Sequence, residues 1–220
     1  MEDARSRARR LARESLERGD TTGWFERLYA TAQGDAQAIP WVDAGPGRNF
    51  VEWARREQPP GSGKRALTVG CGLGDNAEEL ARLGFNVVAF DIAPTAIEWC
   101  RTRFPGSRVR YVVADLLAAP LAWDGAFDFV LEAFTVQVLT GDLRRQAIER
   151  IARFVAPGGT LLVIARGREP DDDPGSMPWP LTRAELELFA GGGLTLVRFE
   201  DYLDRHNDPP ARRFRVEFRR

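Results

Sequence analysis

Short apolar runs alternate with helical stretches from Lys64 onward, and this alternation is the main structural signal in the chain. The apolar runs are typical of strands, and they lie at 66–70, 86–91, 108–115, 126–132 and 160–165. Apolar residues at helical spacing follow four of them, at 75–83, 94–103, 142–154 and 182–190. Strands that alternate with helices predict an α/β fold, with a parallel sheet covered by helices on both faces.

The last part of the chain has a different pattern. Two strand-like runs, 194–204 and 211–220, are separated only by a short polar segment that contains Pro209 and Pro210. Two strands joined so closely form a hairpin. The pattern therefore predicts antiparallel pairing at the end of the sheet.

The first 63 residues have no strand-like runs and form a predicted N-terminal helical segment (1–63), ahead of a binding domain at 64–220. Helices are expected at 22–30 and 48–57, with a third at 3–18. The apolar face of 3–18 is thin, so we expect that helix to be solvated. The segment 31–47 contains several glycines and prolines and is predicted to be a loop.

Composition narrows the class of protein. The chain has 220 residues and a formal net charge of −1, which provides no general attraction to nucleic acid or to an anionic membrane. No apolar run approaches the ~20 residues that span a bilayer, and the charged N-terminus is unlike a secretory signal, so we expect a cytoplasmic location. With two cysteines and one histidine, a His/Cys metal site is not expected.

Candidate binding residues stand where the predicted strands end, because ligands of open parallel sheets bind at the carboxyl ends of the strands. Asp91 ends the second strand, where its carboxylate can accept hydrogen bonds from two vicinal ribose hydroxyls. Asp115 ends the third strand and can accept from an adenine amine. Each aspartate has an alternative role as a helix cap, Asp91 for the helix that starts near Pro94.

The glycine-rich stretch V-G-C-G-L-G-D, residues 69–75, ends the first strand. Its G-L-G-D-N-A part fits a dinucleotide fingerprint, but Asp75, Glu78 and Glu79 place negative charge at the helix start, where a phosphate needs positive potential. No Walker lysine follows, which excludes a P-loop. The set therefore favours an adenosine ligand without phosphate and with positive charge, and S-adenosylmethionine fits best.

These stretches resemble the motifs of class I S-adenosylmethionine-dependent methyltransferases in order and spacing over about 64–220: V-G-C-G-L-G-D, V-A-F-D-I-A-P-T-A-I, A-D-L-L and F-V-A-P-G-G-T-L-L-V. The resemblance implies a Rossmann-like, doubly wound seven-stranded sheet, mostly parallel, with an antiparallel last strand. It also implies roles for single residues. Gly70, Cys71, Gly72 and Gly74 would form the cofactor turn. Asp91 would hold the ribose and Asp115 the adenine, with Ile92 and Leu116 packing the base, and Glu132 and Ala133 bordering the methionine portion.

A narrower resemblance is to the thiopurine and thiol methyltransferase branch, which includes halide and tellurite methylating relatives. It rests on W-F-E-R-L-Y, I-P-W-V-D and P-W-P-L-T-R-A-E-L, although Val42 interrupts the second motif. It implies that the N-terminal helical segment caps the cofactor as a lid. The residues that would then wall the site are Trp24, Phe25, Tyr29 and Trp41, with Trp41 against the cofactor. Core packing is the equally weighted alternative for these aromatic residues. Trp179 is expected to add an apolar wall from the loop 166–181, which follows the fifth strand and borders the acceptor.

We therefore predict methyl transfer to a small-molecule acceptor, with a thiol or another soft nucleophile preferred. An O- or N-methyltransferase and a non-enzymatic S-adenosylmethionine sensor are the alternatives, and an NAD-dependent oxidoreductase is disfavoured. No nucleic-acid or membrane partner is expected, and the chain is a monomer or a homodimer. Glu132 is the weak candidate for a catalytic base, with a structural role as its alternative. His206 is expected in a loop at the wrong edge of the sheet.

Overall fold

The structure is a computed structural model that describes residues 2–42, 45–206 and 209–220. A single seven-stranded sheet runs through it in the order β3-β2-β1-β4-β5-β7-β6. The strands are β1 (Arg65–Val69), β2 (Asn86–Asp91), β3 (Arg110–Val113), β4 (Phe127–Ala133), β5 (Val155–Arg166), β6 (Thr195–Asp204) and β7 (Ala211–Arg219). All neighbours along β3-β2-β1-β4-β5 are parallel, and only β7 runs against its neighbours. The predicted fold class is confirmed.

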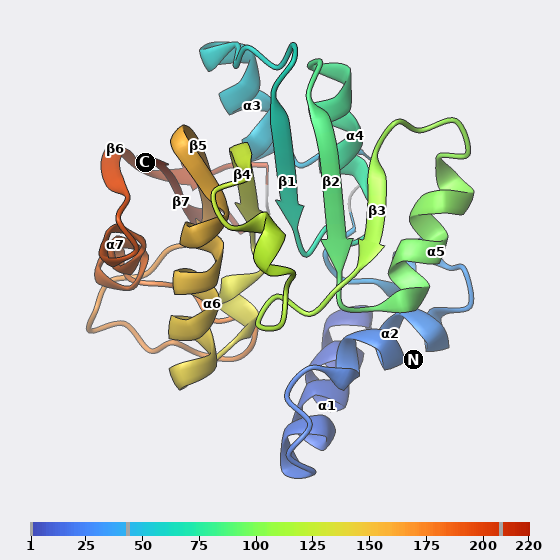
Figure 1. Ribbon diagram of the computed structural model, residues 1–220. Coiled ribbons are helices and arrows are strands. Elements are labelled where there is room, and N and C mark those ends of the chain that lie inside the picture. Colours follow the sequence, from blue (N-terminus) through green and yellow to red (C-terminus); the bar gives the residue numbers. More distant parts are fainter. Residues whose placement is uncertain (1, 43–44, 207–208) are drawn as a thin grey trace.

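Helices cover both faces of the sheet (Figure 1). One face packs against α6 (Gly141–Phe154) and α7 (Arg183–Gly191), through a core that contains Ile148, Ile151 and Phe189. The opposite face packs against α3 (Arg48–Glu57), α4 (Asp75–Arg82) and α5 (Pro94–Arg103), through a second core. The buried strands are apolar on both sides, as a doubly covered parallel sheet requires.

The order of the strands places a candidate site at one edge of the sheet. The chain runs outward from β1 to β2 and β3, then crosses back so that β4 pairs with the other side of β1. This reversal is the topological switch point, at which ligands of open α/β sheets bind beyond the carboxyl ends of the strands. In Figure 1 the arrowheads of β1, β2 and β3 point toward α1 (Ala4–Glu17) and α2 (Gly23–Ala32).

The first helix, α1, is not solvated as its thin apolar face suggested, so that expectation is wrong. Ala8, Leu11 and Ala12 are buried in a third cluster together with residues of α2, including Trp24 and Leu28. A narrow stripe of small residues suffices here because α2 packs directly against it. The remaining surface of α1 is charged and faces solvent, which is why the helix appears solvated in the sequence.

A carboxylate of α2 attaches this helix to the rest of the molecule. Glu26 accepts hydrogen bonds from the backbone N–H of Thr95 (3.0 Å) and from its hydroxyl (2.5 Å). Thr95 lies in the first turn of α5, which has no side-chain cap of its own. Glu26 therefore satisfies a free N–H at a helix start, where the helix dipole also favours negative charge.

The hairpin of β6 and β7 is confirmed, but the position predicted for His206 is wrong. Asp204 pairs with Ala211, and Arg166 at the end of β5 pairs with Arg213, so the hairpin turn lies at the carboxyl edge of the parallel strands. His206 is therefore on the same edge as the candidate site. Its imidazole points toward Glu52 of α3 (3.7 Å).

Candidate functional site

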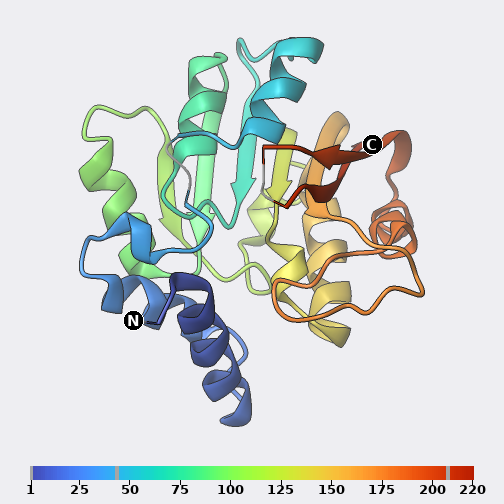
Figure 2. The same cartoon turned by 180° about the vertical axis from the view of Figure 1, so that it is seen from behind.

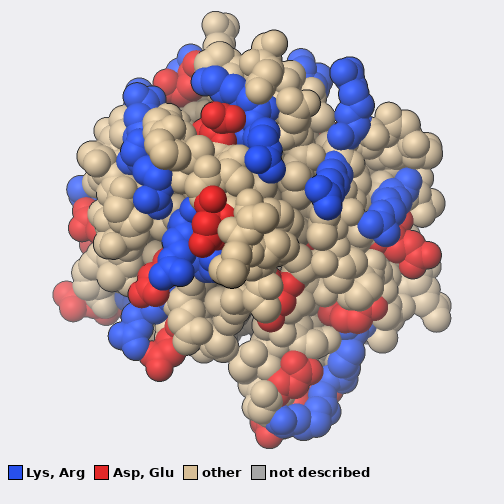
Figure 3. All heavy atoms as spheres, in the orientation of Figure 1, with Lys and Arg blue, Asp and Glu red and all other residues tan. Residues whose placement is uncertain are grey.

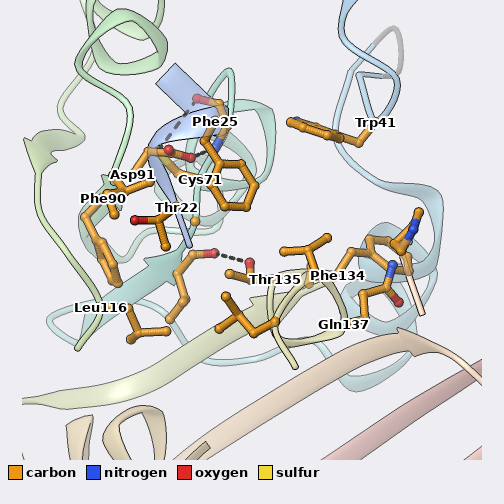
Figure 4. Close-up of a pocket in the computed structure, with 18 of the residues that line it drawn as sticks. Thr22, Phe25, Trp41, Cys71, Phe90, Asp91, Leu116, Phe134, Thr135 and Gln137 are labelled. Atoms are coloured by element: carbon orange, nitrogen blue, oxygen red, sulfur yellow. Dashed lines mark hydrogen bonds between the residues drawn. The ribbon is translucent and has the colours of Figure 1, made fainter. Parts of the chain in front are cut away.

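A cavity of about 290 Å³ lies at the switch point. Part of its wall consists of residues at the ends of β1, β2, β3 and β4, and described residues of the N-terminal segment, among them Thr22, Phe25 and Trp41, supply another part (Figure 4). The structure brings the following predicted site residues to this cavity: Phe25, Tyr29, Trp41, Gly70, Cys71, Gly72, Asp91, Ile92, Asp115, Leu116 and Ala133. Their roles as ligand contacts remain predictions.

The glycine turn after β1 requires glycine at three positions. Gly70, Gly72 and Gly74 have φ values of 56°, 54° and 91°. These values lie in the left-handed region, which residues with a Cβ rarely adopt. A Cβ on Gly70 would also lie 2.6 Å from Oγ1 of Thr135. A Cβ on Gly72 would meet only Tyr29 Oη (3.4 Å) and Trp41 Nε1 (3.9 Å), the two groups that stand over the turn. The turn thus brings bare backbone close to the cavity.

Gly74 does not line the cavity but ends the turn at the start of α4. A Cβ there would lie 2.6 Å from Tyr111 Oη and 3.1 Å from Cys100 Sγ. We expect Gly74→Ala to lower the free energy of unfolding by about 1–3 kcal/mol, because of the left-handed backbone and this contact. Denaturant unfolding measures it, with Gly106→Ala as the control, since a Cβ on Gly106 meets nothing within 4 Å. Equal stability of the two variants would contradict the strained turn.

Asp91 is a buried carboxylate that faces the cavity. Its Oδ2 accepts from the N–H of Gly72 (3.0 Å) and its Oδ1 from the N–H of Ala93 (3.0 Å). Each oxygen keeps a lone pair for a further donor such as a hydroxyl. Burial raises the pKa of Asp91 to about 6, although the two backbone donors counteract this shift. Asp91 therefore orders the backbone before α5, as expected from its alternative role as a helix cap. It also offers hydrogen-bond acceptors to a ligand.

Asp115 is exposed at the rim of the cavity, after β3. Its Oδ1 accepts from the N–H of Leu117 (2.8 Å), which fixes the side chain. Leu116 is buried beside it and, with Phe90 at the end of β2, forms an apolar face of the cavity (Figure 4). An apolar face next to a carboxylate acceptor suits a flat base with an exocyclic amine.

Glu132 is fully buried beneath the cavity and is absent from its wall among the described residues. Its Oε1 accepts from the N–H groups of Thr135 (2.6 Å) and Val136 (3.0 Å), whereas no described group bonds to the buried Oε2. Burial raises the pKa of Glu132 to about 7. These contacts order the turn that carries Phe134, whose φ is 65°, and Thr135 into the cavity.

The predicted aromatic residues divide into two groups. Phe25, Tyr29 and Trp41 line the cavity, and Trp41 Nε1 donates to Tyr29 Oη (2.9 Å). The rings of Tyr29 and Trp41 meet edge to face, with centroids 6.1 Å apart. Trp24 and Trp179 do not line it: Trp24 is 2% exposed in the α1–α2 core, and Trp179 packs against that core. The late motif instead reaches the cavity through the residue before Trp179, a proline.

Gln137 is a lining residue that sequence reasoning missed. It is buried, its Oε1 accepts from the N–H of Arg166 (2.9 Å), and its backbone carbonyl accepts from the N–H of Trp179 (2.9 Å). It thereby joins β5 and the segment 167–181 at the cavity. Its only sequence signal is a polar residue in the apolar stretch F-T-V-Q-V-L after β4.

The acidic start of α4 is not an open negative surface, so that part of the argument against phosphate is wrong. Asp75 forms a two-point ion pair with Arg103 (2.8 and 3.0 Å). Glu78 accepts from Tyr111 Oη (2.6 Å), and Glu79 pairs with Arg82 (2.6 Å). Only Asp75 of these three carboxylates reaches the cavity.

Cys71 and Cys100 are free thiols that meet at the glycine turn. Cys100 Sγ lies 3.2 Å from the carbonyl oxygen of Gly72, and Cys71 Sγ lies 3.9 Å from the same atom. The neighbouring Cys100 thiol and burial raise the pKa of Cys71 well above its usual value. Cys71 therefore stays protonated at neutral pH, which does not suit a nucleophile.

Similarity to known proteins was found over the centre of the chain. Residues 67–163 match the family model described as a methyltransferase domain. An uncharacterized methyltransferase of Mycobacterium tuberculosis is 36% identical over 98 residues, which cover 44% of this chain and 48% of that relative. The human tRNA N(3)-cytidine methyltransferase METTL2B is 31% identical over 120 residues, which cover 50% of this chain and 32% of that protein. The chain spans less than half of the length of either relative.

Solved structures share the fold over most of the chain. One comes from work on the conversion of a disulfide bond into a thioacetal group during echinomycin biosynthesis, with a TM-score of 0.71, 24% identity and coverage of 89% of this chain and 92% of that one. Another is the N-methyltransferase NodS from Bradyrhizobium japonicum in complex with S-adenosylhomocysteine, with a TM-score of 0.68, 23% identity and coverage of 88% and 95%.

Residues 67–163 are therefore similar to a methyltransferase domain, and the chain has the fold of the solved methyltransferase NodS. The prediction of S-adenosylmethionine as the cofactor is consistent with this similarity, because the NodS structure holds S-adenosylhomocysteine. The resemblance to the thiopurine and thiol branch, and the division of the chain at residue 63, stay predictions. Among the described residues, no helix is long and apolar enough to cross a membrane.

Proposed function

We propose that this chain is an S-adenosylmethionine-dependent methyltransferase that acts on a small-molecule acceptor. The observation that carries this proposal is the meeting of Asp91, Asp115 and the glycine turn around one cavity. In this proposal Gly70 and Gly72 lie under the amino-acid half of the cofactor, Asp91 holds the ribose and Asp115 the adenine amine. An adenosine ligand needs backbone that it can approach closely, two carboxylate oxygens that accept from its ribose hydroxyls, and an apolar face for its base. The cavity offers all three.

The remaining cavity wall supports a small acceptor that is nucleophilic by itself. Apart from the strand ends, its described residues are mainly apolar, aromatic or uncharged, and they include Thr21, Thr22, Phe25, Trp41, Val42, Gln137, Val138, Leu139, Leu143 and Pro178. The carboxylates among the described lining residues are Asp75, which is paired with Arg103, and the two aspartates assigned to the cofactor. An acceptor oxygen or amine more often needs a base than a thiol does, so a thiol is the preferred acceptor.

The chain's contribution to catalysis in this proposal is alignment and exclusion of water. When bound, the cofactor supplies a methyl group on a sulfonium, which is already a strong electrophile. The N-terminal aromatic residues Phe25, Tyr29 and Trp41 close the cavity from above, and Thr135 and Gln137 border it from below. Binding that holds the acceptor atom in line with the methyl group lowers the activation free energy, because the two reactants are already oriented before they react. A dry cavity also keeps water from competing.

Calorimetry followed by an acceptor screen tests the proposal. We expect S-adenosylhomocysteine to bind the purified protein and NAD not to bind. The screen then offers thiols, halides, amines, phenols and tRNA with S-adenosylmethionine and quantifies S-adenosylhomocysteine. Binding of NAD alone would refute the cofactor assignment, binding of S-adenosylhomocysteine without turnover on any acceptor would favour the sensor alternative, and turnover on tRNA alone would refute a small-molecule acceptor.

A further inference from the structure

Four arginines from three elements gather next to the cavity, and we call them the arginine cluster: Arg5 and Arg9 on α1, Arg166 at the end of β5, and Arg213 on β7. Arg166 and Arg213 are directly opposite in the antiparallel β5–β7 pair. Their side chains therefore leave the sheet on the same face, where two like charges destabilise the pairing. A pair of this kind needs a compensating partner.

The helix arginines reach the same place. Arg9 Nε donates to the carbonyl of Met177 (2.8 Å), and Arg166 Nη1 donates to the carbonyl of Pro178 (3.2 Å). These carbonyls belong to consecutive residues, so a guanidinium of α1 and one of β5 meet on one short stretch of chain. Arg5 lies four residues before Arg9, and residues four apart share one helix face. Figure 2 shows α1 and the segment after β5 below the same edge of the sheet.

The carboxylates that the structure describes compensate little of the positive charge of the cluster. Arg213 Nε lies 3.5 Å from Asp204 Oδ2 but forms no hydrogen bond, although it is buried. Among the described residues, none of the ion pairs within 4.0 Å involves Arg5, Arg9 or Arg166. Burial and the nearby positive charges of Arg213, Arg5 and Arg9 lower the pKa of Arg166. On the face seen in Figure 3, arginines and lysines are interspersed with acidic residues.

The arginine cluster is connected to the cavity through three lining residues. The Arg213 guanidinium lies over the ring of Phe134, 5.1 Å from its centroid. The backbone N–H of Arg166 donates to Gln137, and its guanidinium donates to the carbonyl of Pro178. Phe134, Gln137 and Pro178 all line the cavity. The cluster therefore lies behind these three lining residues, on the side of β5, although none of its four arginines lines the cavity itself.

We propose that the methyl acceptor carries an anionic group, a carboxylate or a phosphate, and that Arg166 and Arg9 bind this group. The inference rests on the proposed methyltransferase function and specifies its substrate class. Guanidinium groups match both anions with paired N–H donors, and such charge-assisted bonds are stronger than neutral ones. An anion at this point would also offset the repulsion between Arg166 and Arg213. A small acceptor fits because residues of the N-terminal segment line this cavity of about 290 Å³.

Matched acids and methyl esters test the proposal: thiosalicylate, 4-hydroxybenzoate and anthranilate, each against its ester. We expect the wild-type protein to use at least one acid with a kcat/KM about tenfold or more above that of its ester. Arg166→Gln and Arg9→Gln should each lower kcat/KM for the acid about tenfold, mainly through KM, and lower kcat/KM for the ester much less. Arg198→Gln, on β6 and paired with Glu57, is the matched control and should change neither. Competition by benzoate against phenyl phosphate distinguishes a carboxylate site from a phosphate site.

Binding measurements separate this inference from the proposed function. Calorimetry first establishes that each variant binds S-adenosylhomocysteine, and the loaded protein is then titrated with thiosalicylate, benzoate and phenyl phosphate. We expect at least one anion to bind and Arg9→Gln, an exposed position on α1, to weaken it. If S-adenosylhomocysteine binds but none of the anions does, or if esters and acids behave alike, the anionic acceptor is refuted while the methyltransferase proposal stands. Turnover on tRNA alone would also refute it.

Discussion

Asp91→Ala is expected to weaken the binding of S-adenosylhomocysteine by about 100-fold or more, because two charge-assisted hydrogen bonds to ribose hydroxyls are lost. The free protein already uses Asp91 to hold the N–H groups of Gly72 and Ala93, so part of the loss could come from the loop. A 2′-deoxy analogue separates the two effects. If Asp91 binds the ribose, the affinities of the variant and the wild-type protein should differ much less for the 2′-deoxy analogue than for S-adenosylhomocysteine. Calorimetry with both ligands measures this difference.

A matched control is Asp128→Ala, which removes a carboxylate that accepts from the N–H of Arg65 at the opposite end of the sheet. We expect Asp128→Ala to bind S-adenosylhomocysteine with the affinity of the wild-type protein. Affinity of the wild-type protein should fall below about pH 6, since burial raises the pKa of Asp91 to about 6 and the ligand's hydroxyls favour the ionised form. Asp91→Asn should lose this pH dependence. An affinity of Asp91→Ala within twofold of the wild type would refute the ribose assignment.

Glu132→Gln is expected to change the pH dependence of stability. The pKa of Glu132 is raised by burial from 4.5 to about 7, so the folded protein holds its proton more tightly than the unfolded chain. The stability from this proton is fully present below pH 4.5 and is lost as the pH rises through 7. Relative to the variant, the wild-type protein should therefore lose about 3 kcal/mol of unfolding free energy between pH 4 and pH 8.

Denaturant unfolding of both proteins at several pH values measures this effect, because the difference between them removes contributions from all other groups. Glu149→Gln on the exposed face of α6 controls for the change in net charge. Since Glu132 does not line the cavity, we also expect the variant to keep methyl transfer on an acceptor found in the screen. Loss of turnover with unchanged binding of S-adenosylhomocysteine would instead support Glu132 as a base.

The elements of the sheet could be predicted because their signals are local. The bounds predicted for 48–57, 86–91 and 94–103 coincide with α3, β2 and α5. Strand β5 begins five residues earlier than predicted, at Val155, because Val155 pairs with Phe127 across an irregularity in the ladder. A pairing of this kind depends on a partner strand far away in the sequence, and it leaves no local pattern.

Part of the candidate site could also be predicted, namely the residues at the strand ends. Asp91 and Asp115 are recognisable because each follows an apolar run directly, and the rules for parallel sheets place such ends at one edge. Gln137 and the arginine cluster were missed, because their neighbours come from distant elements. Arg166 and Arg9, for example, are 157 positions apart along the chain and meet only on the segment around Met177 and Pro178.

Local sequence pattern alone was enough for the α/β class, the terminal hairpin, the need for glycine in the turn and the acidic residues at the ends of the second and third strands. Each of these follows from the backbone preferences or periodicity of neighbouring residues. Tertiary structure alone decided that α1 is packed, that the carboxylates of α4 have hydrogen-bond or ion-pair partners, that Glu132 is buried beneath the cavity and that four arginines gather behind three of its lining residues. Burial and charge pairing are properties of the folded surroundings, which combine side chains that lie far apart in the sequence.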